Sequence, residues 1–445
     1  MIDSDTPRGR WPALSVASAG YFFVLLDVTI VNVALARIAG DLNGSRSELQ
    51  WVVDAYALVL AATMLGAGDL ADRLGSRRLF LAGLALFGAA STACALAPSA
   101  GVLIAARTVQ GLGAAAILPS SLAIVNQLFP DAEERPRAIG VWAGLGGSAL
   151  VLGPILGGIL VGPLGWRAIF WANVPLVLAA LAGGLVLLPE GPVARAARPD
   201  LHGQALGTAA LATLVFALIE GGRTGFGSAA TLAGAAAALA TLIGFVGVER
   251  RSRRPLLDLG WFRRAEFSGA NAGSALMNLG TLGALFAIGL YLQQSRGLSP
   301  LAAGLNLVPL ALPLAALTPF TGRLVGVVGA RLPAGLGLLA SGAGYLGTAL
   351  LGGGAIDGPG GWACLALAGA GMGVAAPALV AGATEALGPD RAGIAAAVNN
   401  TARQVGGAVG VALIGGFAAV SVALATSGTA LILGGTAALG LMRRE

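Results

Sequence analysis

Long apolar runs, each bounded by charged residues, proline or glycine, make up most of the 445-residue chain. The run LVLAATMLGAG is apolar on every side, whereas the strands of a membrane barrel alternate apolar and polar positions. A helix needs roughly 20 apolar residues to cross a bilayer. The pattern therefore predicts an all-α polytopic membrane protein. We expect spans near 12–36, 50–70, 79–97, 101–128, 138–161, 168–188, 204–222, 229–248, 267–291, 301–321, 332–352, 361–384, 392–418 and 422–441, fourteen in all.

The composition supports the same class of protein. Charged residues make up 11% of the chain and hydrophobic residues 56%, whereas an ordinary soluble protein carries roughly 25% charged residues. This excludes a soluble globular enzyme, a disordered chain and a disulfide scaffold. The 70 glycines indicate helices that approach one another closely. Cys94 and Cys364 stand alone in apolar runs, so neither a disulfide nor a metal site is predicted.

The positive charge predicts the orientation in the membrane. The formal net charge is +6, and all 27 basic residues are arginine. With the N-terminus inside the cell, most arginines fall in cytoplasmic segments, as in other membrane proteins. We therefore expect both termini in the cytoplasm and a multi-pass protein of the cell (cytoplasmic) membrane. The charge does not indicate a nucleic-acid partner.

The two halves of the chain have similar sequence features at equivalent places. The loop after the second span, GDLADRLGSRR, has a degraded copy after the tenth, TGRLVGVVGAR. Repeated bundles of six helices are common in secondary transporters. The predicted organisation is an N-terminal six-helix bundle at 1–190, a linker with two extra transmembrane helices at 191–264, and a C-terminal six-helix bundle at 265–445. The two linker helices offer few polar side chains, so we expect them outside a transport core.

The loop after the second span resembles the signature loop of the major facilitator superfamily. A tight turn between helices needs the backbone freedom of glycine, and an aspartate there can accept backbone N–H groups at a helix N-terminus. The resemblance implies a gating loop that locks one state of the transporter. Its residues here are Gly68, Asp72, Arg73, Gly75 and Arg77.

The fourth and fifth spans resemble two further motifs of that superfamily. The fourth matches L-x-x-x-R-x-x-Q-G-x-G-A-A, with Arg107 and Gln110. An arginine inside a span is costly, so it predicts a functional role, although an arginine near a helix end can also reach toward the interface. The fifth span contains GPILGG, which is similar to the antiporter motif of exporters. A proline there removes one helical hydrogen bond, and the glycines allow a neighbouring helix to approach. The motif residues are Gly153, Pro154, Gly157 and Gly158.

Several longer stretches resemble one branch of the superfamily. LDVTIVNVAL, LQWVVDAY, LYLQQSRGLSPLAAGLNLVP and GIAAAVNNTARQVGGAVGVAL are similar to the fourteen-span drug:proton antiporters of the EmrB/QacA type, and most to methylenomycin-resistance exporters. The resemblance implies export of small hydrophobic toxic compounds, driven by the proton gradient and by alternating access, with no other cofactor. It implies a substrate, protons and membrane lipid as partners, and a monomer. The alternative is a proton-coupled importer or exporter of a metabolite.

Few ionisable residues lie within the predicted spans. A proton-coupled carrier needs a carboxylate whose protonation differs between its two states. At about 1.5 Å per residue along a helix, Asp27, Arg107 and Asp54 all fall in the outer half of the membrane. We predict that these three couple protons to transport, Asp27 first and Asp54 second. Asp27 is otherwise a static charge partner or a hydrated cavity residue, and Asp54 an interfacial residue.

Polar and aromatic residues within the spans could shape a substrate cavity, although each could equally bond to a neighbouring helix. In the family that the chain resembles, some members that handle dications carry carboxylates in the thirteenth span. This chain has asparagines at the matching positions, Asn399 and Asn400, so a specialised dication exporter is not expected. The candidates are Asn32, Tyr56, Gln110, Trp142, Asn278, Gln293, Asn399 and Arg403.

Other functional classes find less support. A membrane enzyme would need a catalytic cluster, but the one histidine, His202, lies in a charged loop, and no phosphate loop or nucleophile motif is present. A channel is disfavoured by the repeated bundles. We therefore predict a transporter and not an enzyme.

Overall fold

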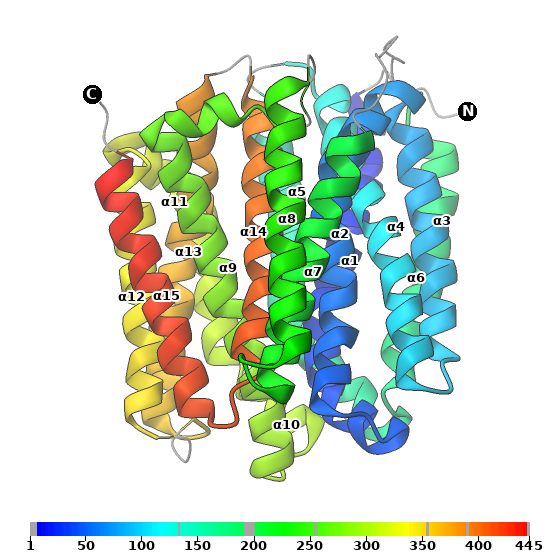
Figure 1. Ribbon diagram of the computed structural model, residues 1–445. Helices are drawn as coiled ribbons and strands as arrows, with labels where there is room; N and C mark the ends of the chain where they lie inside the picture. The colour runs from blue at the N-terminus through cyan, green and yellow to red at the C-terminus, as the bar shows by residue number, and fades with distance from the viewer. Residues whose placement is uncertain are drawn as a thin grey trace. The chain divides into compact units, whose positions relative to one another are not determined.

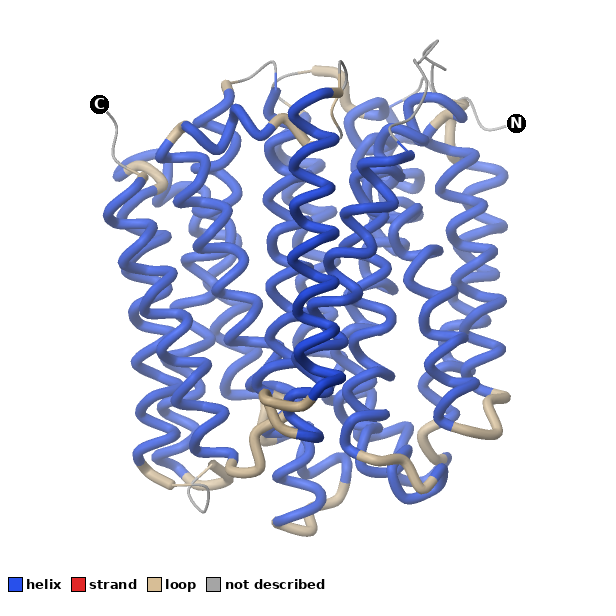
Figure 2. The backbone as a smooth tube through the Cα atoms, in the orientation of Figure 1, coloured by secondary structure: helices blue, strands red, loops and turns tan. Residues whose placement is uncertain are grey.

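The computed structural model describes residues 7–131, 134–190, 201–252, 255, 257–352, 356–388 and 391–442. The chain divides into two compact units, residues 1–199 and 200–445, and each is described by itself. Every regular element in the described residues is helical (Figure 2).

Among the described residues, the first unit forms six long helices, which are labelled in Figure 1. They are α1 (Pro7–Leu42), α2 (Arg46–Leu74), α3 (Ser76–Ala95), α4 (Ala100–Leu128), α5 (Arg135–Leu164) and α6 (Arg167–Leu187). Helix α4 packs against α2 and α3, and α1 packs against α4 and α5. Helix α4 therefore lies at the centre of this unit, in contact with α1, α2 and α3.

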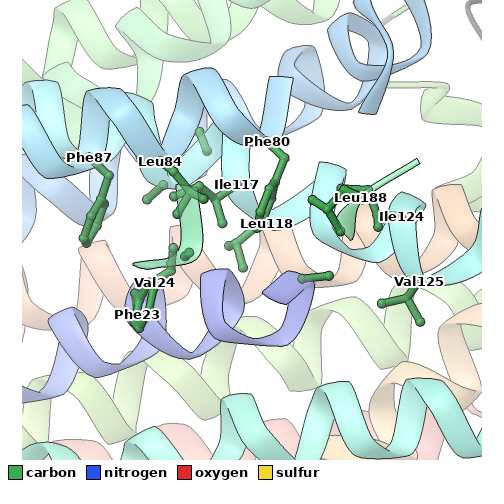
Figure 3. Packing of buried hydrophobic residues seen from close by; sticks show 14 of the residues in the cluster. Phe23, Val24, Phe80, Leu84, Phe87, Ile117, Leu118, Ile124, Val125 and Leu188 are labelled. Carbon is green, nitrogen blue, oxygen red and sulfur yellow. The ribbon is translucent and has the colours of Figure 1, made fainter. Parts of the chain in front are cut away.

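A hydrophobic core joins α1, α3 and α4. Phe80, Leu84 and Phe87 of α3 are fully buried and point toward α1 and α4 (Figure 3). Ile117 of α4 and Val24 of α1 meet them there. Burying a side chain of this size contributes roughly 1.5–3 kcal/mol, so this core fixes the depth at which the polar residues of the same helices lie.

The described part of the second unit forms eight long helices and three short elements. They are α7 (Leu201–Thr224), α8 (Ala229–Arg251), η1 (Leu259–Arg263), α9 (Ala265–Leu290), η2 (Tyr291–Ser295), α10 (Pro300–Leu305), α11 (Val308–Val328), α12 (Arg331–Leu350), α13 (Pro359–Leu387), α14 (Ala392–Ile414) and α15 (Val420–Leu441). Helix α9 packs against α14 and α15, and α12 against α13 and α15. Helices α7 and α8 pair, and α7 also contacts α14.

The long helices correspond closely to the predicted spans. Ten helices in the described part of the chain are long and apolar enough to cross a membrane. Helices α2, α5, α12 and α14 lie outside this set, so fourteen spans remain a prediction.

One predicted boundary is wrong. A single span was expected at 301–321, but the chain forms α10 and then α11, which extends to Val328. Ser299 caps α10 by accepting the amide of Ala302, and Pro309 lies in the first turn of α11. Proline lacks an N–H group and suits the start of a helix. The tenth long helix therefore begins later than the apolar run.

Glycine brings particular helix pairs into backbone contact. A Cβ atom at Gly406 would lie 2.0 Å from the carbonyl oxygen of Ala275, and one at Gly410 would lie 2.1 Å from that of Leu279. Both glycines are on α14, and both carbonyls are on α9. Contact this close is possible only without a side chain. By contrast, a Cβ atom at Gly326 of α11 would meet nothing within 4 Å.

We expect the substitution of alanine for glycine to have opposite effects at these two places. Gly410→Ala should destabilise the protein by about 1–3 kcal/mol, because the new methyl group overlaps α9. Gly326→Ala should stabilise it by roughly 0.5–1 kcal/mol, because alanine favours a helix. Thermal unfolding of the purified proteins in detergent measures both. Equal shifts of one sign would contradict the close contact of α9 and α14.

Candidate functional site

A group of polar side chains lies buried among the apolar helices of the first unit. It consists of Asp27 of α1, Ser91 of α3, Arg107 and Gln110 of α4, and Asn173 of α6. Each of these residues is at most 2% exposed. We call them the polar cluster. Four helices thus contribute to one water-excluded site.

The carboxylate of Asp27 lies at the centre of the polar cluster. Its Oδ2 atom accepts a hydrogen bond from Nη1 of Arg107 and forms an ion pair with it. Its Oδ1 atom accepts from Nε2 of Gln110 at 3.0 Å and from Nδ2 of Asn173 at 3.3 Å. The same two amides donate to Oγ of Ser91, at 2.9 and 3.4 Å. Both carboxylate oxygens therefore have partners, and the two amide partners of Oδ1 are linked through the hydroxyl of Ser91.

The guanidinium group of Arg107 is held on several sides. Its Nε atom donates to the carbonyl of Val52 at 3.0 Å, and Nη1 also donates to Oε1 of Gln110 at 2.8 Å. The ring of Tyr56 lies beneath it, with 4.3 Å from Cζ to the ring centroid. The Tyr56 hydroxyl donates to the carbonyl of Val24 at 3.2 Å. A cation over an aromatic face is stabilised by the ring electrons. Arg107 is therefore held by Val52 and Tyr56 of α2 as well as by Asp27.

Each charge of this buried pair depends on the other. Removing two charges from water costs several kcal/mol each, and their attraction offsets this only when the geometry and the remaining hydrogen bonds are good. The polar cluster meets that condition. Loss of either charge leaves the other buried and uncompensated, at a cost of roughly 3–5 kcal/mol. Protonation of Asp27 would remove its charge in the same way.

Asp54 does not join the polar cluster. It lies on α2, two residues before Tyr56, and successive positions at that spacing face nearly opposite sides of a helix. The residue is fully buried. Neither carboxyl oxygen has a hydrogen-bond partner in the described part of the chain. An isolated buried charge is costly, so Asp54 is a second carboxyl group in an unusual environment.

The glycines of α5 pack directly on α1 beside Asp27. A Cβ atom at Gly153 would lie 2.0 Å from Oγ1 of Thr29, and one at Gly157 would lie 3.1 Å from Ile30. The Thr29 hydroxyl donates to the carbonyl of Ala149 at 3.2 Å. Pro154 and Gly158 are buried in the same helix. Thr29 is two residues from Asp27 on α1. A shift of α1 at the polar cluster would therefore change the contact between Thr29 and α5.

The predicted gating loop is partly described. Gly75 joins α2 to α3 with φ of 90°, a conformation that other residues rarely adopt. Arg77 bonds to the end of α6, donating to the carbonyl oxygens of Gly184 at 3.4 Å and Leu185 at 2.6 Å. It also pairs with Glu190 at 3.3 Å. The interactions of Arg77 that the structure gives thus lie within the first unit.

The other loop residues are placed less completely. A Cβ atom at Gly68 would lie 4.0 Å from Pro119, and the Arg73 side chain is half-buried. The side chain of Asp72 lies outside the described residues.

The helical fold and these motifs agree with the sequence comparison. The sequence profile of the Major Facilitator Superfamily matches residues 17–411. The chain belongs to this superfamily. It is therefore a multi-pass membrane protein of a transporter family.

Named resistance proteins are among the similar proteins. The chain is 38% identical to multidrug resistance protein Stp of Mycobacterium tuberculosis (strain CDC 1551 / Oshkosh), over 92% of this chain and 76% of that protein. It is 34% identical to the methylenomycin A resistance protein of Streptomyces coelicolor, over 99% of this chain and 94% of that protein. It is 36% identical to the tetracenomycin C resistance and export protein of Streptomyces glaucescens, over 92% and 76%.

A solved structure has the same fold. The human organic anion transporter MFSD10 (TETRAN) matches with a TM-score of 0.68 over 98% of this chain and 100% of that chain. The sequence identity is 17%, so this likeness concerns the fold alone.

The remaining cavity candidates of the transporter's first unit bond to neighbouring groups. Asn32 donates to the carbonyl of Val28 at 2.9 Å, and its Oδ1 atom is buried with no partner among the described residues. Trp142 stacks on Tyr21 with 4.1 Å between ring centroids and donates to Ser121 at 3.2 Å. Trp142 is half-buried. Gln110, a member of the polar cluster, and Tyr56, which lies against Arg107, are both fully buried.

The candidates of the second unit fall into two groups. Asn399 is fully buried and joins α14 to α9, donating to the carbonyl of Ala270 at 3.3 Å and accepting from Ser274 at 3.1 Å. Gln293 lies in the π-helical turn η2 and donates to Gly289 at 3.3 Å. Asn278 and Arg403 are half-buried. Thus Asn399 secures a helix pair, while Asn278 and Arg403 remain partly accessible.

Sequence reasoning did not find Ser91 and Asn173. Each is a small polar residue in an apolar run, and nothing in the local sequence distinguishes it from a residue that bonds to its own helix. Asn173 lies in the stretch WRAIFWANVP, where its neighbours are mostly apolar and aromatic. The amide side chain of Asn173 within an apolar helix is itself a signal, because polar groups in a membrane need partners.

We expect Gln110→Ala to destabilise the transporter by about 1–3 kcal/mol, because it leaves buried partners unsatisfied on Asp27, Arg107 and Ser91. Thr108→Ala on the same helix is the control, since among the described residues the Thr108 hydroxyl bonds to the carbonyl of Ile104 within its own helix. The control should shift stability by about 0.5 kcal/mol or less. Thermal unfolding in detergent makes the comparison. Equal stability of the two variants would mean that Gln110 does not support the buried pair.

Proposed function

We propose that this transporter exports small hydrophobic toxic compounds across the cell membrane in exchange for protons, by alternating access. The relatives named for resistance to methylenomycin A and tetracenomycin C, and for multidrug resistance, support the export of such compounds. The proposal includes fourteen spans, both termini in the cytoplasm, a two-helix linker between two six-helix bundles, and a monomer. The polar cluster is the observation that supports proton coupling.

The proposed coupling begins with proton uptake by Asp27. Its ionised form is held by Arg107, Gln110 and Asn173. A proton on Asp27 cancels the attraction to Arg107, while Arg107 keeps the carbonyl of Val52 and the ring of Tyr56. The protonated and ionised forms therefore favour different positions of α1 relative to α2 and α4. Such a difference in stability between two states is what a proton must supply to drive transport.

The proposed route from the proton to the movement of helices runs through α5. Thr29 of α1 contacts Gly153 and bonds to the carbonyl of Ala149. Pro154 lies next to this contact and interrupts the hydrogen bonds of its helix. A shift of α1 at Asp27 would therefore act on a helix that bends more easily than its neighbours. This gives the antiporter motif a mechanical role.

An exporter and an importer on the same fold are separated by the direction of transport. Accumulation of drugs and dyes in cells with and without the protein, and with and without an uncoupler, measures that direction. Lower accumulation that an uncoupler abolishes supports export driven by protons. Higher accumulation would favour the importer.

Asp27→Asn should abolish substrate-induced proton release from protein in liposomes, because an amide cannot cycle between charge states. Arg107→Ala should impair it as well, because it leaves the carboxylate without its cation. The double variant should be no worse than either single variant if the two residues act as one unit.

Each variant needs a folded control, since breaking a buried pair also costs stability. Only preparations that keep the wild-type elution profile and bind substrate are compared. An Asp27→Asn protein that exchanges protons for substrate at the wild-type ratio would show that the proton binds elsewhere.

Asp54→Asn should lower the number of protons exchanged for each substrate without abolishing exchange. The residue is buried and none of its carboxyl oxygens has a described partner, so the amide breaks no hydrogen bond given by the structure. Flux ratios in liposomes, with proton and substrate measured together, test this. An unchanged ratio would leave Asp54 without a part in coupling.

A further inference from the structure

The second unit contains a cation at the middle of a helix, and no carboxylate in the described residues forms an ion pair with it. Arg403 lies eleven residues from Ala392 and eleven from Ile414, the two ends of α14. At about 1.5 Å per residue, this is about 16 Å from either end. Its Nε atom is buried and has no hydrogen-bond partner in the described residues.

None of the described carboxylates of this unit forms an ion pair with Arg403. Glu220 pairs with Arg223, and Asp357 pairs with Arg296, each away from the middle of α14. The remaining described carboxylates lie at helix ends or in the segment between α8 and α9; they are Glu249, Asp258, Glu266 and Glu385. An arginine at mid-bilayer depth costs several kcal/mol unless it is paired or hydrated, and such residues face a bundle interior or a water-filled cavity.

A second donor lies one helical turn away. A Cβ atom at Gly407 would lie 3.8 Å from Nδ2 of Asn278 on α9. Residues four apart share one face of a helix, so Arg403 lies next to Gly407 on α14. Asn278 is half-buried like Arg403, and the structure gives its side-chain amide no hydrogen bond. Two side chains with free donors thus face the same region of the α9–α14 pair.

We propose that Arg403, with Asn278 beside it, binds an acidic oxygen group of the transported compound, such as a carboxylate. A guanidinium group offers donors in a planar fork that matches two carboxylate oxygens, and it accepts nothing. Its positive charge repels organic cations, in agreement with the asparagines at neighbouring positions of the helix. This inference rests on the proposed export function and assigns a substrate class to it: hydrophobic compounds that carry an acidic oxygen.

The test uses a matched pair of probes, 2-naphthoate and the neutral 2-naphthamide, which share a ring system and differ in charge. Binding to purified protein in lipid nanodiscs is measured by equilibrium dialysis. Wild type should prefer the carboxylate. Arg403→Gln should weaken binding of 2-naphthoate by about 10- to 100-fold, the range for a hydrogen bond to a charged group, and change 2-naphthamide little.

Further variants separate recognition from misfolding. Arg403→Lys keeps the charge without the fork, so it should restore part of the preference. Arg403→Glu should reverse it toward 2-naphthylmethylammonium, a gain that an unfolded protein cannot produce. Arg296→Gln removes an arginine already paired with Asp357 and should leave the preference unchanged.

The outcomes distinguish this inference from the proposed function. Equal binding of both naphthalene probes by wild type, an unchanged preference in Arg403→Gln, or displacement of the carboxylate by millimolar chloride would overturn the anion site. Proton-driven export of neutral dyes in the same preparation would then leave the proposed function standing. Selective binding of 2-naphthoate without any proton-driven flux would instead support the site and overturn the proposed export mechanism.

Discussion

The buried ion pair between Asp27 and Arg107 is the constraint on which the first unit depends. Two charges in an apolar helix bundle are tolerable only when each meets the other and the remaining polar atoms are satisfied. Gln110, Asn173 and Ser91 provide those hydrogen bonds from three further positions. Helices α1, α3, α4 and α6 are thereby held in one register, and a change at Asp27 concerns all of them.

Close helix contact complements this electrostatic constraint. Gly153 brings α5 against Thr29 in the first unit, and Gly406 and Gly410 bring α14 against α9 in the second. The first contact lies two residues from Asp27 on α1, and Asn399 adds hydrogen bonds between the second pair, α14 and α9. Glycine allows the backbones to meet, so small displacements of one helix are passed directly to the next.

The two units differ in how their charges within helices are balanced. In the first, Arg107 has an anion, a backbone carbonyl and an aromatic ring as partners. In the second, Arg403 makes no hydrogen bond or ion pair with the residues that the structure describes. The same residue type is therefore part of a closed network in one unit and offers free donors in the other. This contrast is the basis on which we propose a coupling role for Arg107 and a recognition role for Arg403.

The sequence alone determined the helical class, most helix positions and the superfamily, because uninterrupted apolar runs and turn-forming glycines are local features. It also indicated that Asp27 and Arg107 have similar depths. It did not predict the break between α10 and α11, where Ser299 and Pro309 start separate helices within one apolar run.

Only the tertiary structure decided which polar residues meet. Asp27 and Asp54 are both aspartates within apolar runs, yet one has three side-chain donors and the other has no described partner. Ser91 and Asn173 became part of the site because α3 and α6 bring them to Asp27 from 64 and 146 residues away. Hydropathy fixes how deep a residue lies, but the rotation and packing of each helix decide what its side chain touches.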